Sequence, residues 1–259
     1  MSRAGRQGGA RTAASYRDTA VVLRKVDYGE ADRIFTLLTR QHGKVGAIAK
    51  GIRRSPRSLA ATLELFSTVD VQLARGRNLD VVLQAVRLPG PRVTADLERT
   101  AHAALITELA DHVTEERHPL DGIYELTVRG LEEVAQEPEP RRATAYFMMA
   151  ALDLLGYAPE LTHCVACHQP LPEAPAAFSP PAGGVVCATC MPPGAPVLPV
   201  RALKVLRVMA SGSIGLYRRL RLEPPLLAEV ENVLEAQLEY HLDRRLKSLR
   251  ILRQMRSCE

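Results

Sequence analysis

The spacing of apolar residues changes part-way along this 259-residue chain, and that change restricts the possible folds more than any other feature. Between residues 16 and 88, apolar residues form short runs or alternate with polar ones, as in β-strands. From residue 94 onward they recur at every third or fourth position, as in helices that bury one face. We therefore expect an α+β protein whose strands and helices occupy separate parts of the chain.

Five short strands are expected in the first part. They cover residues 18–26, 34–39, 44–50, 68–73 and 79–86, and a basic link over residues 53–57 separates the third from the fourth. Five strands in about 70 residues, with a break at this point, fit a small closed barrel of the OB-fold type.

Helices are expected in the second part. Apolar stripes run over residues 97–113, 123–134 and 145–155, which favours three antiparallel helices. Ten prolines then exclude a long helix between residues 159 and 199. Further helices are expected from about residue 203 and residue 226, and the basic tail over residues 244–256 is interpreted as a packed helix with a charged outer face.

Four of the five cysteines form two C-x2-C pairs inside the proline-rich segment. Two intervening residues let one tight turn direct both sulfur atoms at a single tetrahedral ion, and two such turns complete a shell of four thiolates. The pairs are separated by nineteen residues, a spacing typical of zinc sites. The predicted ligands are Cys164, Cys167, Cys187 and Cys190.

A closed shell of four thiolates predicts one structural Zn²⁺ per chain, because no position is open for a reacting water. Two disulfides are the alternative, which the lack of a visible secretory signal disfavours. His163 and His168 could substitute as ligands, and Cys258 is left over. The expected organisation is a disordered basic start over residues 1–15, an OB-fold over 16–90, and a helical domain over 91–259 with a zinc-finger insertion at about 160–198.

The charge of the chain is distributed unevenly. Residues 1–85 carry 15 Lys and Arg against 7 Asp and Glu, whereas residues 86–160 carry 7 against 14. A basic first third is expected to bind a polyanion, and a solvated surface with chance asymmetry is the alternative. The sequence has neither a phosphate-cradling Gly-rich loop nor a metalloprotease or nucleophile-elbow motif, so we expect no enzymatic activity. It has no apolar stretch long enough for a membrane span, which predicts a cytoplasmic protein.

Several motifs resemble the RecO family of bacterial DNA repair and recombination mediators. They are YRDTAVVL at residues 16–23, YGEADR at 28–33, HGK at 42–44, AKGIRR at 49–54 and LLGYAP at 154–159, which precedes the cysteines. The resemblance covers residues 16 to about 255. It implies an OB-fold joined to a helical domain that carries a zinc site. It further implies binding of single- and double-stranded DNA, annealing of complementary strands, and cooperation with RecR and single-stranded-DNA-binding protein to help load RecA, in a nucleoid-associated protein.

Basic residues within and just after the second and third strands are the candidates for DNA binding, because an OB-fold groove is lined from that region. Lys44 and Lys50 share strand parity and are expected to point to one face. Binding is expected to depend on phosphates, with weak sequence preference. The candidates are Arg33, Lys44, Lys50, Arg53, Arg54 and Arg57.

Two other functions fit the same residues. An RNA-binding OB-fold protein would share the basic barrel but prefer strands that carry 2′-hydroxyl groups. A zinc-containing interaction scaffold would use its helices and zinc module to bind proteins, and its basic barrel would only be solvated.

Overall fold

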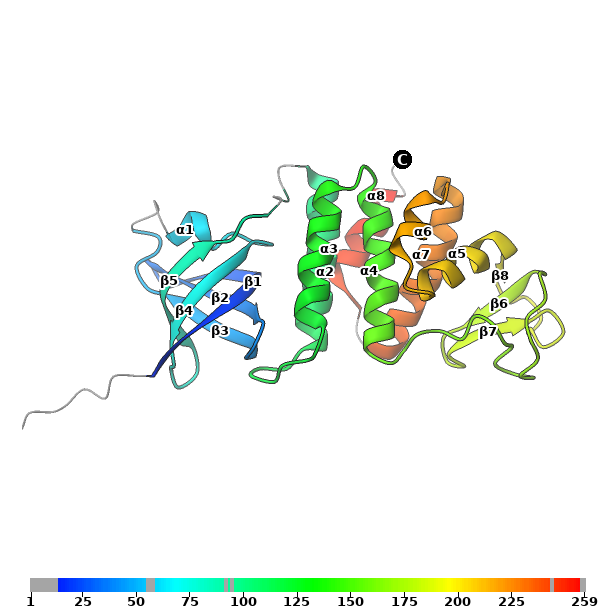
Figure 1. Cartoon of the computed structure of the whole chain (residues 1–259), viewed down its shortest axis with the longest axis horizontal. Coiled ribbons are helices and arrows are strands. Elements are labelled where there is room, and N and C mark those ends of the chain that lie inside the picture. Colours follow the sequence, from blue (N-terminus) through cyan, green and yellow to red (C-terminus); the bar gives the residue numbers. More distant parts are fainter. Residues whose placement is uncertain (1–13, 55–58, 91–92, 94–95, 243–244, 257–259) are drawn as a thin grey trace, which may run out of the picture. The chain divides into compact units, whose positions relative to one another are not determined.

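The computed structural model describes residues 14–54, 59–90, 93, 96–242 and 245–256 (Figure 1). The chain forms two compact units. The first comprises residues Met1–Leu88 and Glu116–Pro119, and the second comprises Pro89–Glu115 and Leu120–Glu259. The first is built on strands and the second mainly on helices, so the expected α+β class is confirmed.

The first unit is a closed five-stranded barrel with strand order β1-β2-β3-β5-β4. Neighbouring strands are antiparallel except β3 and β5, which pair in parallel. This is the predicted OB-fold-type barrel. Its elements are β1 (Ser15–Tyr28), β2 (Asp32–Thr39), β3 (Gly43–Ala49), a short helix α1 (Leu59–Thr62), β4 (Thr68–Ala74) and β5 (Asp80–Arg87).

Strand β1 is longer than its apolar run indicates because it pairs with two partners. Its first half pairs with β4, and its second half pairs with β2 as far as Tyr28 opposite Asp32. An irregularity between Val22 and Arg24 shifts the register and lets the strand bend from one partner to the other. The alternation in β4 directs Val69, Val71 and Leu73 into the barrel, where all three are fully buried.

Residues 116–119 belong to the barrel unit although they follow the first helix of the second unit in the sequence. The backbone N–H of Arg117 donates to the carbonyl oxygen of Lys44 at 2.8 Å. A Cβ atom at Gly43 would lie 2.5 Å from the backbone of His118, so this segment packs directly on the start of β3. No pattern in the sequence predicted this packing.

The second unit contains seven helices among its described residues. They are α2 (Leu97–Val113), α3 (Ile123–Gln136), α4 (Pro140–Leu154), α5 (Val200–Ala210), α6 (Ile214–Arg219), α7 (Pro224–Leu242) and α8 (Lys247–Arg256). Helix α4 begins at Pro140, earlier than its apolar stripe indicates, because a proline in the first turn loses no helical hydrogen bond. The short helix α6 was not predicted.

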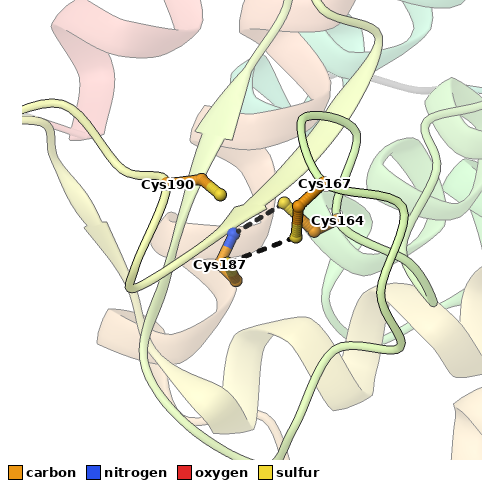
Figure 2. A group of neighbouring side chains, drawn as sticks. All are labelled: Cys164, Cys167, Cys187 and Cys190. Atoms are coloured by element: carbon orange, nitrogen blue, oxygen red, sulfur yellow. Dashed lines mark hydrogen bonds between the residues drawn. The ribbon is translucent and has the colours of Figure 1, made fainter.

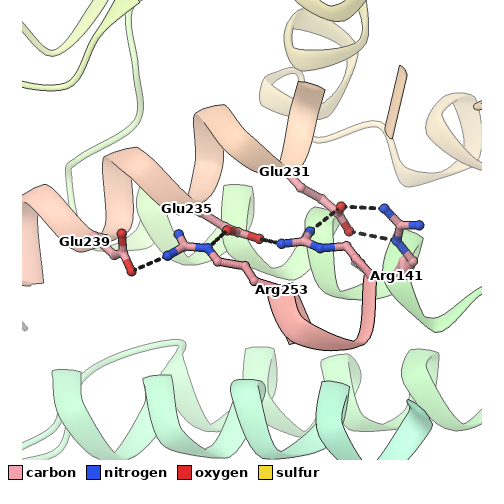
Figure 3. A network of polar contacts seen from close by, with 6 residues as sticks. Arg141, Glu231, Glu235, Glu239 and Arg253 are labelled. Carbon is pink, nitrogen blue, oxygen red and sulfur yellow. Dashed lines mark hydrogen bonds and ion pairs between the residues drawn. The ribbon is translucent and has the colours of Figure 1, made fainter. Parts of the chain in front are cut away.

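Helix α8 is fastened to the unit by charged contacts at both ends. At its start, Glu108 of α2 accepts hydrogen bonds from the backbone N–H groups of Lys247 and Ser248 at 2.9 and 2.8 Å. Further along, arginines from α4 and α8 meet carboxylates of α7 in one network (Figure 3). In this network Glu231 and Glu235 are almost fully buried, and each contacts two guanidinium groups.

The proline-rich segment folds into a three-stranded sheet with strand order β7-β6-β8. The strands are β6 (Ala176–Ser179), β7 (Gly184–Cys187) and β8 (Val197–Leu198). The prolines exclude a long helix, as expected, but they leave room for strands of two to four residues.

Candidate metal centre and nucleic-acid interface

Two tight turns hold the four predicted metal ligands. In the first, the backbone N–H of His168 donates to the carbonyl oxygen of Cys164 at 2.8 Å. In the second, which follows directly on β7, the N–H of Cys190 donates to the carbonyl oxygen of Cys187 at 3.0 Å. Residue 168 adopts a left-handed backbone with φ of 60°, which reverses the chain after the first pair.

The two turns lie together because the backbone between them packs closely. A Cβ atom at Gly184 would lie 2.5 Å from the carbonyl oxygen of Glu160. Glycine at this position allows the N–H of Val185 to donate to that oxygen at 3.0 Å, and the N–H of Val165 to donate to the carbonyl oxygen of Val185 at 3.0 Å. The first turn is thereby fixed against the strand that carries Cys187.

The four sulfur atoms converge on one point and are free thiols, with no disulfide between them (Figure 2). All four lie within 4.8 Å of one another, and the Sγ atoms of Cys167 and Cys187 are 3.9 Å apart. Tetrahedral zinc with Zn–S bonds of about 2.3 Å needs sulfur atoms about 3.8 Å apart. The cluster therefore fits a metal ion after small side-chain movements.

Negative charges on sulfur atoms this close together repel one another. Burial opposes ionisation of Cys164, but N–H groups of Cys187, Cys167 and Ala166 outweigh burial and lower its pKa to about 6. Cys190 behaves in the opposite way, because the sulfur atoms of Cys187 and Cys167 raise its pKa to about 12. A divalent cation would balance the charge of the later thiolates, which is the chemistry of a structural metal centre.

The neighbouring histidines lie outside the cluster of four sulfurs. The Nδ1 atom of His163 is 3.0 Å from the hydroxyl of Thr162 and 4.0 Å from a carboxylate oxygen of Glu160. His163 and His168 are both exposed, and the group of residues positioned to hold a metal contains cysteines alone among the described residues.

The predicted DNA-binding residues do not form a single cluster. Arg33 and Arg53 lie at the end of the barrel near the β1–β2 turn, and both contact Asp27, at 2.7 Å and 3.7 Å. Arg54 lies 3.7 Å from Glu30 in the same turn. The hydrogen bond from Arg33 is the main cause that lowers the pKa of Asp27, and the charge of Arg53 contributes.

Lys44 lies at the other end of β3. Lys44 pairs with Leu38 of β2, whereas Arg33, at the start of β2, pairs with Ala49. At about 3.3 Å per residue, about 17 Å of strand β2 separates Arg33 from the position opposite Lys44. Lys50 is exposed in a turn just beyond the end of β3, which corrects the expectation that it belongs to the strand. That it shares a face with Lys44 stays a prediction. The proposed site residue Arg57 lies outside the described residues.

A polar network that sequence reasoning missed lies close to Lys44. Asp80, at the first position of β5, is fully buried. Its carboxylate accepts hydrogen bonds from the hydroxyl of Tyr16 at 2.6 Å, the guanidinium of Arg117 at 2.8 Å and the backbone N–H of Gly76 at 3.0 Å. A lone aspartate after a turn gives no sequence signal of this kind, because its partners are 64, 37 and 4 residues away.

Family models match both units of the chain. The model described as the N terminal of recombination protein O matches residues 14–88, and the model described as its C terminal matches residues 94–250. The chain belongs to the RecO family.

The RecO match confirms the resemblance drawn from the sequence motifs, and it connects this chain with DNA repair and recombination. The N-terminal RecO region coincides with the barrel. The C-terminal RecO region includes both the helices and the four cysteines. Among the described residues of this RecO-family chain, none of the helices combines the length and the apolar character that crossing a membrane requires.

Proposed function

We propose that this RecO-family protein is a recombination mediator that binds single- and double-stranded DNA, anneals complementary strands, and helps load RecA onto DNA coated with single-stranded-DNA-binding protein. The observation that carries this proposal is the match of both RecO regions to a chain whose first part is a basic, OB-fold-type barrel. Its partners would be DNA, RecR and single-stranded-DNA-binding protein, with RecA acted on indirectly.

The proposed activity needs binding and no bond chemistry. Two DNA strands repel each other through their phosphates, and a cation-rich surface that contacts both strands lowers that repulsion. The excess of Lys and Arg in residues 1–85 supports this role for the first part of the chain. We therefore propose a protein that is not an enzyme and that acts in the cytoplasm, at the nucleoid.

The metal centre has a structural part in this proposal. Cys164, Cys167, Cys187 and Cys190 would hold one Zn²⁺, whose four bonds would join the two tight turns of a segment with a small sheet and little core. The free thiols and their spacing support a metal in place of disulfides.

Lys44, Arg53 and Arg54 are three of the six phosphate-binding residues proposed from the sequence; the others are Arg33, Lys50 and Arg57. Replacing Lys44, Arg53 and Arg54 with Ala should weaken binding to every DNA sequence alike, because interactions with phosphate carry no sequence information. Removing one phosphate-binding cation should reduce the slope of log affinity against log salt by about 0.7 to 0.9. An unchanged slope in the folded triple variant would assign phosphate binding to another face.

Annealing on two substrates tests the function. The full-length protein should speed annealing of complementary oligonucleotides, both naked and coated with single-stranded-DNA-binding protein. On coated strands, single-stranded-DNA-binding protein already occupies the phosphates, so attraction by charge alone is not enough. We therefore propose that the helical unit carries a binding surface for single-stranded-DNA-binding protein. If the protein anneals naked strands but not coated strands, the proposed mediator role is wrong. Tighter binding to RNA than to DNA of equal sequence would favour the RNA-binding alternative.

A further inference from the structure

The loop between β4 and β5, residues 75–79, presents two arginines to solvent. Arg75 and Arg77 are both exposed. Within the part of the chain that the structure describes, neither guanidinium is paired with a carboxylate, whereas Arg33, Arg53 and Arg54 each lie beside one. A phosphate that approaches Arg75 or Arg77 therefore has no carboxylate to displace.

Asp80, which directly follows the loop, fixes the conformation of the loop. Its carboxylate oxygen Oδ1 accepts both from the N–H of Gly76, inside the loop, and from the guanidinium of Arg117. A Cβ atom at Gly76 would lie 1.8 Å from the carbonyl oxygen of Leu79, so only glycine allows the loop to close this tightly. The negative charge of Asp80 is compensated by Arg117, and the carboxylate is fully buried. Asp80 therefore does not neutralise the charges of Arg75 and Arg77, which can attract a phosphate.

Tyr16 supports the same loop from β1. Its hydroxyl donates to the second carboxylate oxygen of Asp80 at 2.6 Å, and the guanidinium of Arg75 lies 5.3 Å from the centre of its ring. The ring therefore limits the positions that Arg75 can adopt. Because Asp80 pairs with Ala47 in β3, the loop also lies next to the strand that carries Lys44, and a Cβ atom at Gly46 would lie 2.8 Å from the side chain of Leu79.

We infer that the β4–β5 loop is a preorganised phosphate-binding element for single-stranded nucleic acid, with Arg75 and Arg77 as the phosphate-binding residues and Asp80 and Tyr16 as positioning residues. The inference rests on the proposed DNA-binding function and adds residues to it. Loops at this position in OB-folds flank the groove in which oligonucleotides bind. Preorganisation raises affinity because the cations do not have to be ordered when the strand arrives.

The test measures binding of a fluorescein-labelled oligo-dT of about 20 nucleotides, long enough to fill one OB-fold site, to the full-length protein by anisotropy over a series of salt concentrations. In the Arg75→Ala, Arg77→Ala double variant the log–log salt slope should fall by about 1.4, which corresponds to two single-strand phosphates. A matched control removes two other exposed arginines, through Arg219→Ala and Arg221→Ala on the helical unit, and should retain the wild-type slope.

Positioning by Tyr16 has a different signature. Tyr16→Phe keeps the ring and both loop cations but loses the hydrogen bond to Asp80, so affinity should fall severalfold at unchanged slope. In the background of the loop double variant, Tyr16→Phe should have no further effect, because it acts through the two arginines. A merely structural Tyr16 would lower the unfolding temperature and leave oligo-dT binding unaltered.

The outcomes separate this inference from the proposed function. If wild-type protein binds oligo-dT and the loop double variant retains the full slope, the loop is not the phosphate-binding element, although DNA binding stands. If Tyr16→Phe weakens binding equally with and without the loop arginines, Tyr16 does not act as a positioning residue. If wild-type protein fails to bind oligo-dT even at low salt, the proposed function itself is wrong.

Discussion

The guanidinium of Arg117 lies 2.8 Å from the buried carboxylate of Asp80, and this ion pair joins positions 37 residues apart within one structural unit. The strands of the barrel end at Arg87, but its structural unit also includes residues 116–119, beyond residue 88, where the N-terminal family match ends. A fragment that stops at residue 90 would lack Arg117 and leave Asp80 with the neutral donors of Tyr16 and Gly76. Full-length variants are for this reason the better test of the barrel.

Arg117→Ala should destabilise the barrel. Asp80 would lose its cationic partner while remaining buried, and an under-satisfied buried polar group costs about 1 to 3 kcal/mol. The loss of unfolding free energy should lie in the lower part of this range, because Arg117 is itself 38% exposed and water can take its place beside Asp80. Chemical denaturation of Arg117→Ala would measure the loss. The exposed Arg77→Ala serves as the control, and an equal loss in both variants would contradict the assigned role of the pair.

Metal removal should destabilise the cysteine segment. Elemental analysis of undenatured protein should find about one zinc per chain, and Cys164→Ser should release it, because the remaining three thiolates no longer close the shell. Cys258→Ser changes the cysteine outside the two pairs and should retain the metal. Protein purified without chelators that contains no metal would contradict the proposed centre.

Removing a buried carboxylate from the α7–α8 network should weaken the attachment of α8. Glu235 is 3% exposed and accepts from Arg253 at 2.6 Å and from Arg256 at 2.7 Å. Glu235→Gln leaves two arginines without full compensation and should lower the free energy of unfolding by about 1 to 3 kcal/mol. Glu173→Gln breaks an exposed pair with Lys204 and should cost well under about 1 kcal/mol. Equal effects of the two substitutions would show that burial does not govern the network.

Acid should weaken the turn that begins the cysteine segment. Hydrogen bonds from the hydroxyl of Thr162 and the N–H groups of His163 and Thr162 lower the pKa of Glu160 to about 2, from 4.5. The folded-state pKa lies below the unfolded value, so the stabilisation is present above about pH 4.5 and is lost as the pH falls towards 2. The difference in unfolding free energy between wild type and Glu160→Gln should shrink over that interval. A difference independent of pH would assign the hydrogen bonds no energetic role.

The barrel fold and the clustering of the four cysteines were predictable because their signals are local. Alternation in β4 and the two C-x2-C pairs depend only on neighbouring residues, and the structure bears them out. The short helix α6 and the strands of the cysteine segment were not predicted, because elements of two to six residues hold too few positions to establish a period.

The contacts around the candidate DNA-binding residues could not be predicted, because they depend on residues distant in sequence. Basic residues near β3 are visible in the sequence, but their pairing with Asp27 and Glu30 is not. The network around Asp80 joins β1, β5 and the segment at residue 117, and no spacing rule connects these three positions.

The salt dependence of single-stranded DNA binding tests the central claim most directly. Wild-type protein titrated with the same labelled oligonucleotide at two salt concentrations should bind more weakly at the higher one, with a log–log slope that reports several bound phosphates. An affinity that does not change with salt, or no binding at low salt, would contradict the account of this RecO-family protein as a mediator that holds DNA through its basic barrel.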